Sequence, residues 1–189
     1  TAPVQERVFY ASFWGIAAAG KEHVPDIEAS THLIMEEDTL TIDSETFRRP
    51  LRYTDAVFFK IFPLSFSHGD ASSFETRIDT AILSEQAAIN LFGTSEALGQ
   101  TFELSDGTAV EVTGVFRNLP LNSHLTTDPN SNGGLDYILN KKVWERNTEA
   151  DLDTNWGSIS SGVRSYFLLK EGSDPYLAAA ELTQLYVDR

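Results

Sequence analysis

The sequence predicts an α+β fold, and three observations lead to that prediction. Strand-like segments with a two-residue alternation occur together with helical segments, but the two kinds do not alternate regularly along the chain. Two pairs of strand-like segments are separated by the short turn sequences Asp43-Ser44 and Asp106-Gly107, which predict hairpins. The chain has 189 residues, 41% of them hydrophobic, and can therefore bury a core of its own.

The first third of the chain is expected to hold a helix followed by a strand and a hairpin. A run of small residues favours a helix that ends near Val24, because Pro25 disfavours helical geometry in the residue before it. The expected elements are, in order, a helix over 12–24, a strand over 27–36, a hairpin over 39–53 and a short aromatic helix or turn over 55–62.

The middle of the chain carries the clearest local signals. A strand over 76–83 is expected to lead into a helix over 85–92. The Ser84 hydroxyl can accept a hydrogen bond from a free N–H of that helix, and Gly93 suits the left-handed position after it. A hairpin over 100–116 follows, with a type I′ turn predicted at Asp106-Gly107.

The last third begins with a stretch rich in turn-forming residues. Residues 118–136 are expected to form a long irregular loop, followed by a short helix over 141–147 and a strand over 165–170. The final helix is expected to start with Asp174 as its N-cap and Pro175 in its first turn. Its core-facing side chains are predicted to be Leu177, Leu182 and Leu185.

Charge and composition exclude several function classes. Lys and Arg total 14 and Asp and Glu total 28, so the formal net charge is −14, and this charge repels nucleic acid. The absence of cysteine excludes disulfides, thiol nucleophiles and cysteine-based metal sites. No segment of the sequence approaches the roughly 20 apolar residues that cross a bilayer as a helix.

One segment imitates a calcium-binding loop. Asp128, Asn130 and Asn132, followed by a glycine, copy the first half of an EF-hand loop, but Leu139 stands where the bidentate glutamate belongs. The three residues are thus a weak calcium candidate, and a plain turn explains them better. Asp151-x-Asp153-x-Asn155 is a still weaker copy, because Trp156 replaces the glycine.

Motifs of enzyme chemistry do not occur in the sequence. The four histidines form no H-x-H or H-x-x-x-H pair, and neither a G-x-S-x-G elbow nor a glycine-rich phosphate loop is present. We therefore expect no catalytic residue, no cofactor and no metal. The residues alone favour a binding or mechanical module over an enzyme.

Four motifs between Tyr53 and Leu125 resemble a known family in their order and spacing. They resemble D-x-x-F-F-x-x-F, V-L-[ST]-E-x-x-A-x-x-x-F-G, D-P-I-G-K-T and V-T-G-V-x-x-D-[LI]-P-x-N-S-H-[LF]. In this sequence they occupy residues 55–62, 82–93, 96–101 and 112–125. The landmark residues that carry the resemblance are Phe58, Phe59, Gly93, Gly99, Gly114, Pro120, Asn122, Ser123 and His124.

By these motifs the chain resembles the MacB-like periplasmic core domain of MacB/FtsX-type ABC transporter permeases, in the form common in Bacteroidetes-type bacteria. It departs from the family at Ala97, where proline is usual, and in a polar insertion over 126–140. The resemblance implies a fold of two subdomains. A porter-like α/β sandwich formed by both chain ends would comprise residues 1–59 and 146–189, and a β-rich inserted subdomain would comprise residues 60–145.

The resemblance also implies a function and a location. The domain would lie at the periplasmic face of the bacterial cytoplasmic membrane, be soluble when excised, and couple cytoplasmic ATP hydrolysis to the handling of a substrate or partner by mechanotransmission. Its expected partners are the permease's own transmembrane helices, a cytoplasmic ATPase, a second permease copy, and a periplasmic adaptor or lipoprotein. The alternatives are a stand-alone secreted ligand- or glycan-binding protein and, less favoured, a carboxylate-dependent hydrolase.

Overall fold

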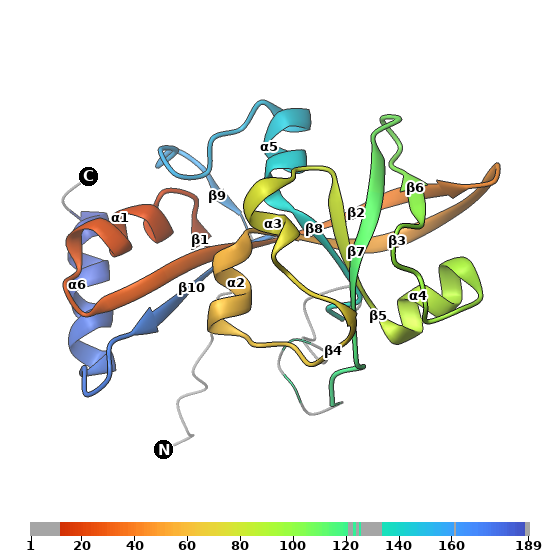
Figure 1. Ribbon diagram of the computed structural model, residues 1–189. Coiled ribbons are helices and arrows are strands. Elements are labelled where there is room, and N and C mark those ends of the chain that lie inside the picture. The colour runs from red at the N-terminus through yellow and green to blue at the C-terminus, as the bar shows by residue number, and fades with distance from the viewer. Residues whose placement is uncertain (1–11, 121–122, 124, 126–133, 161, 188–189) are drawn as a thin grey trace, which may run out of the picture.

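The computed structural model describes residues 12–120, 123, 125, 134–160 and 162–187 (Figure 1). These residues form a mixed β-sheet with helices around it, so the α+β class predicted from the sequence is confirmed. The helices are α1 (Ile16–His23), α2 (Ala56–Ile61), α3 (Ser73–Thr76), α4 (Glu85–Phe92), α5 (Lys141–Thr148) and α6 (Pro175–Val187). None of these helices combines the length and the apolar character that a bilayer crossing requires.

Within the described residues, eight strands form the main sheet, and two short strands form a separate pair. The main sheet runs in the order β10-β2-β3-β8-β5-β7-β4, with β6 pairing to β2 and β7 beside this path, while β1 pairs with β9. The bounds are β1 (Ser12–Phe13), β2 (Ile27–Ile42), β3 (Glu45–Thr54), β4 (Phe66–Gly69), β5 (Thr80–Ser84), β6 (Thr101–Glu103), β7 (Ala109–Phe116), β8 (Tyr137–Asn140), β9 (Ile159–Ser160) and β10 (Val163–Leu169).

Strand β2 is the longest element and changes its neighbour partway along. Its first half, Ile27 to Ile34, pairs antiparallel with β10. Its second half, Ile34 to Ile42, pairs antiparallel with β3. Ile34 is the one residue of β2 that both ladders share, and it is fully buried. The sequence predicted two strands here, but the pairing with β3 continues through Glu37 and Asp38, so they form one.

The two ends of the described chain lie together at one end of the molecule. Helices α1 and α6 pack side by side there, away from α4 and the tip of the β2–β3 hairpin (Figure 1). A methyl group added at Gly20 of α1 would lie 2.6 Å from Leu182 Cδ2, so the glycine allows this close approach.

Helix α6 corrects one sequence prediction. Ala178 is buried, and Leu182 and Leu185 pack partly buried beside it, but Leu177 is 53% exposed. The helical period explains the difference, because positions 178, 182 and 185 share one face and position 177 lies about 100° away from 178. The carboxylate of Asp174 accepts a hydrogen bond from the Tyr176 N–H at 2.8 Å, as expected for an N-cap.

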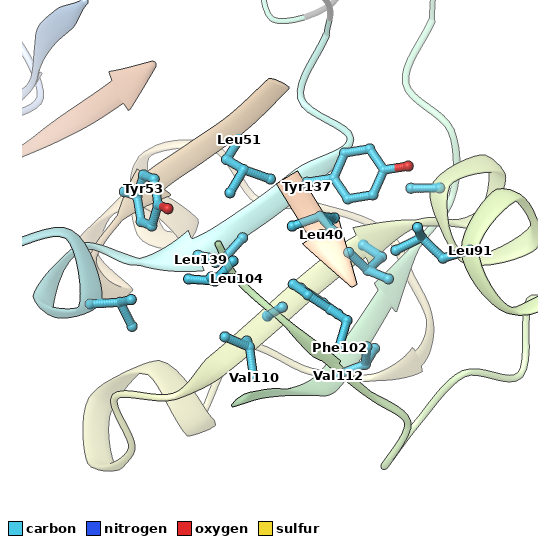
Figure 2. Close-up of a cluster of buried hydrophobic side chains, with 14 of the residues drawn as sticks. Leu40, Leu51, Tyr53, Leu91, Phe102, Leu104, Val110, Val112, Tyr137 and Leu139 are labelled. Atoms are coloured by element: carbon cyan, nitrogen blue, oxygen red, sulfur yellow. The ribbon is translucent and has the colours of Figure 1, made fainter. Parts of the chain in front are cut away.

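The larger core lies between the sheet and helices α4 and α5. Figure 2 shows side chains from distant strands converging in it, among them Leu40 and Leu51 of the β2–β3 hairpin and Phe102 of β6. All three are at most 1% exposed. A second cluster is aromatic and gathers around Phe58 of α2, which contacts Phe59 and Phe62 edge-on or tilted at ring-centroid distances of 5.6 and 5.0 Å.

The structure closely matches the helix and caps that the sequence predicted in the middle third of the chain. Helix α4 has the predicted bounds, the Ser84 hydroxyl accepts a hydrogen bond from the Ala87 N–H at 3.0 Å, and Gly93 has φ 73°. The β6–β7 turn differs, because only Gly107 has a positive φ, whereas a type I′ turn needs two such residues. The Gly107 N–H donates to Leu104 O and the Leu104 N–H to Thr108 O, which makes a three-residue turn with a bulge.

One predicted strand was wrong in its extent, and one strand was missed. Residues 76–79 are not a strand, because α3 ends at Thr76 and β5 begins only at Thr80. Strand β8 was not predicted at all, since its four residues directly follow the polar loop segment. All four are buried between β3 and β5, and this position in the sheet, rather than any local pattern, fixes them as a strand.

Candidate functional site

A cavity of about 320 Å³ lies where α1, the first half of β2 and the first turn of α5 meet. It is adjacent to the point at which β2 changes partner, and its walls carry both positive and negative side chains. The lining residues are Ala17, Ala18, Lys21, Ser30, Thr31, His32, Asp55, Lys141 and Asp153.

Lys141 is the central charge of this cavity. Its side chain is 12% exposed, and its ammonium lies 3.3 Å from Asp55 Oδ2, 3.6 Å from Asp153 Oδ1 and 3.9 Å from Glu145 Oε1. Burial alone would lower the pKa of Lys141, but the three carboxylates outweigh it and raise that pKa. For the Glu145 carboxylate, burial raises the pKa, and the nearby Lys141 ammonium only partly opposes this rise. Lys141 is therefore charged and compensated by carboxylates from three separate segments.

His32 is fixed in one tautomer by its surroundings. The side chain is 1% exposed, and its Nε2 lies 2.7 Å from the carbonyl oxygen of Trp14. A carbonyl oxygen can only accept, so Nε2 carries the proton and donates. Burial first, and the Lys141 ammonium second, lower the pKa of His32, so the ring is neutral near pH 7 and its Nδ1 is an acceptor.

Hydroxyl and carboxylate groups hold the backbone around this cavity. The Thr31 hydroxyl donates to Asp55 Oδ1 at 2.8 Å, and that oxygen also accepts the Val57 N–H at 3.0 Å and so caps α2. The Thr54 hydroxyl donates to the His32 carbonyl oxygen at 2.6 Å and extends the contact between β2 and β3 beyond their ladder. Asp55 is the first residue of the D-x-x-F-F motif, and its conformational role explains why an aspartate suits that position.

The segment that presents Asp153 is a turn tied by its own side chains. Asp151 Oδ1 accepts the N–H groups of Asp153 and Thr154 at 3.0 and 3.3 Å. Asn155 Oδ1 accepts those of Gly157 and Ser158 at 3.0 and 3.1 Å. The oxygens of Asp151 and Asn155 are thus used within the turn, while Asp153, 53% exposed, stands at the mouth of the cavity.

The arrangement suits the recognition of a polar group. Within the described ranges, no three His, Cys, Asp or Glu side chains are placed to hold a metal ion together. The Lys141 ammonium already lies among the carboxylates, where a cation would otherwise be bound. Asp128, Asn130 and Asn132, the weak calcium candidate, lie outside the described residues.

The aromatic and glycine landmarks lie in the core and at turns, away from this cavity. Phe58 is fully buried and Phe59 is partly buried beside it. Gly93 and Gly99 have φ values of 73° and 76°, a region in which side-chain-bearing residues are strained. Gly114 lies in β7, where an added methyl would come within 2.9 Å of both the Asp70 carbonyl oxygen and Phe66 Cε1.

The remaining landmarks follow β7. The Ser123 N–H donates to the Pro120 carbonyl oxygen at 3.0 Å, and the Ser123 hydroxyl accepts the Leu125 N–H at 3.2 Å, which makes a local turn. Asn122 and His124 lie outside the described residues, so their expected turn roles stay predictions.

Sequence reasoning missed the residues of the cavity. His32 was seen only as one of four unpaired histidines, and Lys141 only as part of a short helix. A usable signal existed for His32, because it interrupts an otherwise apolar or small strand segment next to Leu33 and Ile34. Nothing local marks Lys141, and Asp153 was marked only as part of a weak copy of a calcium loop; both reach the cavity only through the tertiary fold.

Comparison with known proteins gives a family match over nearly the whole chain. The profile of the family described as the MacB-like periplasmic core domain matches residues 7–185. No curated protein matches the sequence.

Several solved structures have a similar fold. A domain of a protein assigned as a permease from Porphyromonas gingivalis is 22% identical, with a TM-score of 0.73 over 95% of this chain and 78% of that one. The periplasmic region of MacB from Actinobacillus actinomycetemcomitans is 15% identical, with a TM-score of 0.67 over 91% and 72%. The extracellular domain of the noncanonical ABC-type transporter YknZ from Gram-positive bacteria is also 15% identical, with a TM-score of 0.67 over 95% and 84%.

Proposed function

This chain belongs to the MacB-like periplasmic core domain family, and from that premise we propose that it couples ATP hydrolysis in the cytoplasm to the handling of a substrate or partner outside the membrane. The membership confirms the resemblance found in the four sequence motifs, and it identifies the chain as an extracytoplasmic domain of an ABC transporter permease. The proposed role is mechanical and non-catalytic. The family match over residues 7–185 is the observation that carries it.

The pairing of β2 supports a coupling role. A movement at the α1–α6 end reaches the β10–β2 ladder first, and β2 continues without a break into its ladder with β3. The ion pairs of Lys141 lie near the point at which β2 changes partner. Lys141, at the start of α5, pairs there with Asp55, which lies just before α2. A displacement of one end is thus passed to the other through a paired strand and a buried ion cluster, rather than through a loose linker.

The contact between the two described chain ends also supports this role. The rings of Phe13 and Tyr186 stack with centroids 4.3 Å apart. Segments continuing from these two positions would leave the domain side by side. That arrangement suits a domain inserted between two membrane spans, because both spans would act on the same end of the fold.

We also propose the division into two subdomains, with residues 1–59 and 146–189 in one and 60–145 in the other. The strand order supports it, because β10, β2 and β3 of the first set are contiguous, as are β8, β5, β7 and β4 of the second. Three parallel residue pairs join the sets within the sheet, Arg52 to Thr54 with Ile138 to Asn140. A further pair, Thr41 with Glu103, joins β2 to β6.

The proposed partners are the permease's own transmembrane helices, a cytoplasmic ATPase and a second permease copy. A periplasmic adaptor or lipoprotein is a further partner of the same proposal. The net charge of −14 supports partners with basic contact surfaces.

Spin-label distance measurements on the full permease test the coupling. Single cysteines at Glu96, at the α4 end, and at Ala180, on α6, are suitable because both residues are exposed and the chain contains no other cysteine. The permease is reconstituted in nanodiscs with its ATPase, and the distance between the two copies is measured with and without ATP. We expect an ATP-dependent change at both positions.

An ATPase variant that cannot hydrolyse ATP is the control, and it should trap one of the two distances. Unchanged distances at both positions through the whole ATPase cycle would contradict the coupling role. The parent gene gives an independent check. Apolar stretches of roughly 20 residues on both sides of this domain agree with a permease, whereas a signal peptide and no such stretch would favour the secreted binding protein.

A further inference from the structure

The outward face of α6 carries no charged side chain. Four residues at intervals of four, three and four positions form a stripe along the helix, the α6 stripe: Tyr176, Ala180, Thr183 and Val187. All four are exposed, Tyr176 at 86% and Val187 at 67%. Glu181 is the one charged residue among the 13 that form α6, and it is partly buried.

This composition is unusual for a helix on a protein surface. The outer face of such a helix normally holds charged residues, as α5 does with the exposed Lys142 and Arg146 and α1 with the exposed Lys21 and Glu22. The α6 stripe instead exposes aromatic, aliphatic and hydroxyl side chains, and Leu177 adds a further apolar side chain beside it. An exposed apolar stripe of this kind is typical of a helix that packs against another surface.

The α6 stripe can be buried at little cost in hydrogen bonds. The Thr183 hydroxyl donates to the Ala179 carbonyl oxygen at 2.8 Å within the helix, so it needs no water partner. The side chains of Ala180 and Val187 have no polar atom. Tyr176 lies in the first turn, at the end of the stripe, where its hydroxyl can stay in contact with water while its ring is covered.

We propose that the α6 stripe packs against the α6 stripe of a second permease copy. The inference rests on the proposed function, in which a second copy is a partner. Two domains with a net charge of −14 each repel one another, so they meet most favourably over a surface that has no charge. A basic partner would select the acidic surface instead, and an anionic membrane surface would be repelled by this net charge.

The spacing of the stripe also suits contact with its own copy. In a two-fold symmetric contact the same patch occurs on both partners, so it has to be complementary to itself. Alternating intervals of three and four residues are those of helices that pack along each other's length. The small Ala180 in the middle lets two helices approach closely between the larger Tyr176 and Val187. In the proposed permease, spans continuing from the stacked Phe13 and Tyr186 would hold this end of both domains near the membrane.

The contact depends on the membrane anchors. A specific interface between two free proteins usually buries about 1,000 Å² or more, which four side chains from each copy do not supply. Anchoring both copies in one permease raises the effective concentration of one stripe beside the other. The contact is therefore tested in the full permease.

Cysteine cross-linking tests the contact directly. The chain has no cysteine, so Thr183→Cys, in a permease freed of any other cysteine, places one thiol in the middle of each stripe. Membranes containing the permease and its ATPase are oxidised without nucleotide and with ATP, and the dimer is measured on a non-reducing gel. We expect a disulfide-linked dimer in at least one of the two states.

Gln86→Cys is the matched control for the cross-link. Gln86 is exposed on α4, at the opposite end of the domain from α6 (Figure 1). It should cross-link about tenfold less than Thr183→Cys, because a disulfide forms only between Cα atoms within about 7 Å of each other. Equal cross-linking at the two positions would mean chance collision and would overturn the proposal.

A charge placed in the stripe separates a packed contact from mere closeness. Val187→Glu, added to the Thr183→Cys permease, brings two carboxylates face to face and should lower the dimer fraction by about fivefold or more. Val187 is mostly exposed, so the variant is expected to fold. Ile89→Glu makes the same kind of change at an exposed position of α4 and should leave the dimer fraction unchanged. Equal effects of the two variants would refute the contact.

The mass of the solubilised permease distinguishes the possible failures. A permease that is dimeric by mass but gives no Thr183→Cys cross-link refutes the α6 contact and leaves the coupling role standing. A monomeric permease refutes both the second copy as a partner and this contact. A cross-link to a different protein, or a thiol that lipid shields from a water-soluble maleimide without any cross-link, also overturns the proposal, because another occupant then covers the stripe.

Discussion

The Asp55 carboxylate lies 3.3 Å from the Lys141 ammonium and thereby joins the N-terminus of α2 to the N-terminus of α5. Both residues are mostly buried, and the same carboxylate caps α2 through the Val57 N–H. An ion pair in this setting is expensive to break from one side, because the remaining charge stays buried without compensation. The first prediction follows from this contact.

Lys141→Met should lower the free energy of unfolding by about 2–4 kcal/mol, because Asp55 loses the ammonium beside it. Urea denaturation followed by circular dichroism measures the change. Lys142→Met is the matched control, since Lys142 is exposed in the same helical turn, and its effect should stay within about 0.5 kcal/mol. Equal effects of the two variants would show that the ion cluster does not stabilise the fold.

Asn140→Ala should destabilise the chain by about 2–3 kcal/mol. The Asn140 side chain accepts the Lys142 N–H at 3.1 Å, as the N-cap of α5, and donates to the carbonyl oxygens of Phe74 and Arg77 at 3.0 Å each. The residue is 2% exposed, so water cannot replace these bonds. Thermal unfolding of this variant beside Asn147→Ala, an exposed change in the same helix, measures the difference. Similar melting temperatures for the two variants would contradict this prediction.

Gly114→Ala should lower the free energy of unfolding by about 1–3 kcal/mol, because the added methyl overlaps its neighbours in β7. The new methyl would lie 2.9 Å from the Asp70 carbonyl oxygen, a backbone atom that cannot rotate away. Gly157→Ala is a suitable control, because its methyl would meet only Asn155 Oδ1, at 3.7 Å. Chemical denaturation of both variants provides the measurement, and a Gly114 variant as stable as the control would refute the packing argument.

The free energy of unfolding should decrease as the pH is lowered through the range where histidine titrates. The pKa of His32 is lowered in the folded chain, first by burial and then by Lys141. Below the ordinary histidine pKa of about 6.5, the unfolded chain therefore takes up a proton that the folded chain refuses. The free energy of unfolding should decrease from there downward, by at most about 1.4 kcal/mol per pH unit for this group.

Urea denaturation between pH 7.5 and 5 in the unchanged chain and in His32→Gln isolates this contribution. The variant should show a shallower dependence on pH over that range, because glutamine does not titrate. Parallel curves would mean that His32 takes up its proton equally in both states.

The success of the sequence predictions depended on how local each signal was. Helix α4 was predicted with its bounds because Ser84 and Gly93 act on their own backbone neighbours. Strand β8 was missed because its four residues become a strand only through β3 and β5 on either side. Leu177 was placed in the core because a leucine in an apolar helix gives no clue to which face meets α1.

The cavity could not be predicted for the same reason. Its residues come from α1, β2, the segment before α2, α5 and the turn after α5, which are separated along the chain. Only His32 stood out in its own segment, as a polar residue in a buried strand. The tautomer that makes it an acceptor depends on the Trp14 carbonyl oxygen, and no sequence pattern indicates that contact.

The transfer of β2 from one partner to the other at Ile34 has a consequence for how the domain bears force. In antiparallel pairs the hydrogen bonds lie perpendicular to the strands, so tension along β2 loads each ladder in shear. All bonds of a ladder then resist together instead of opening one after another. The two ladders act in series and meet at one residue, so a load applied along β2 passes from one ladder to the other through Ile34.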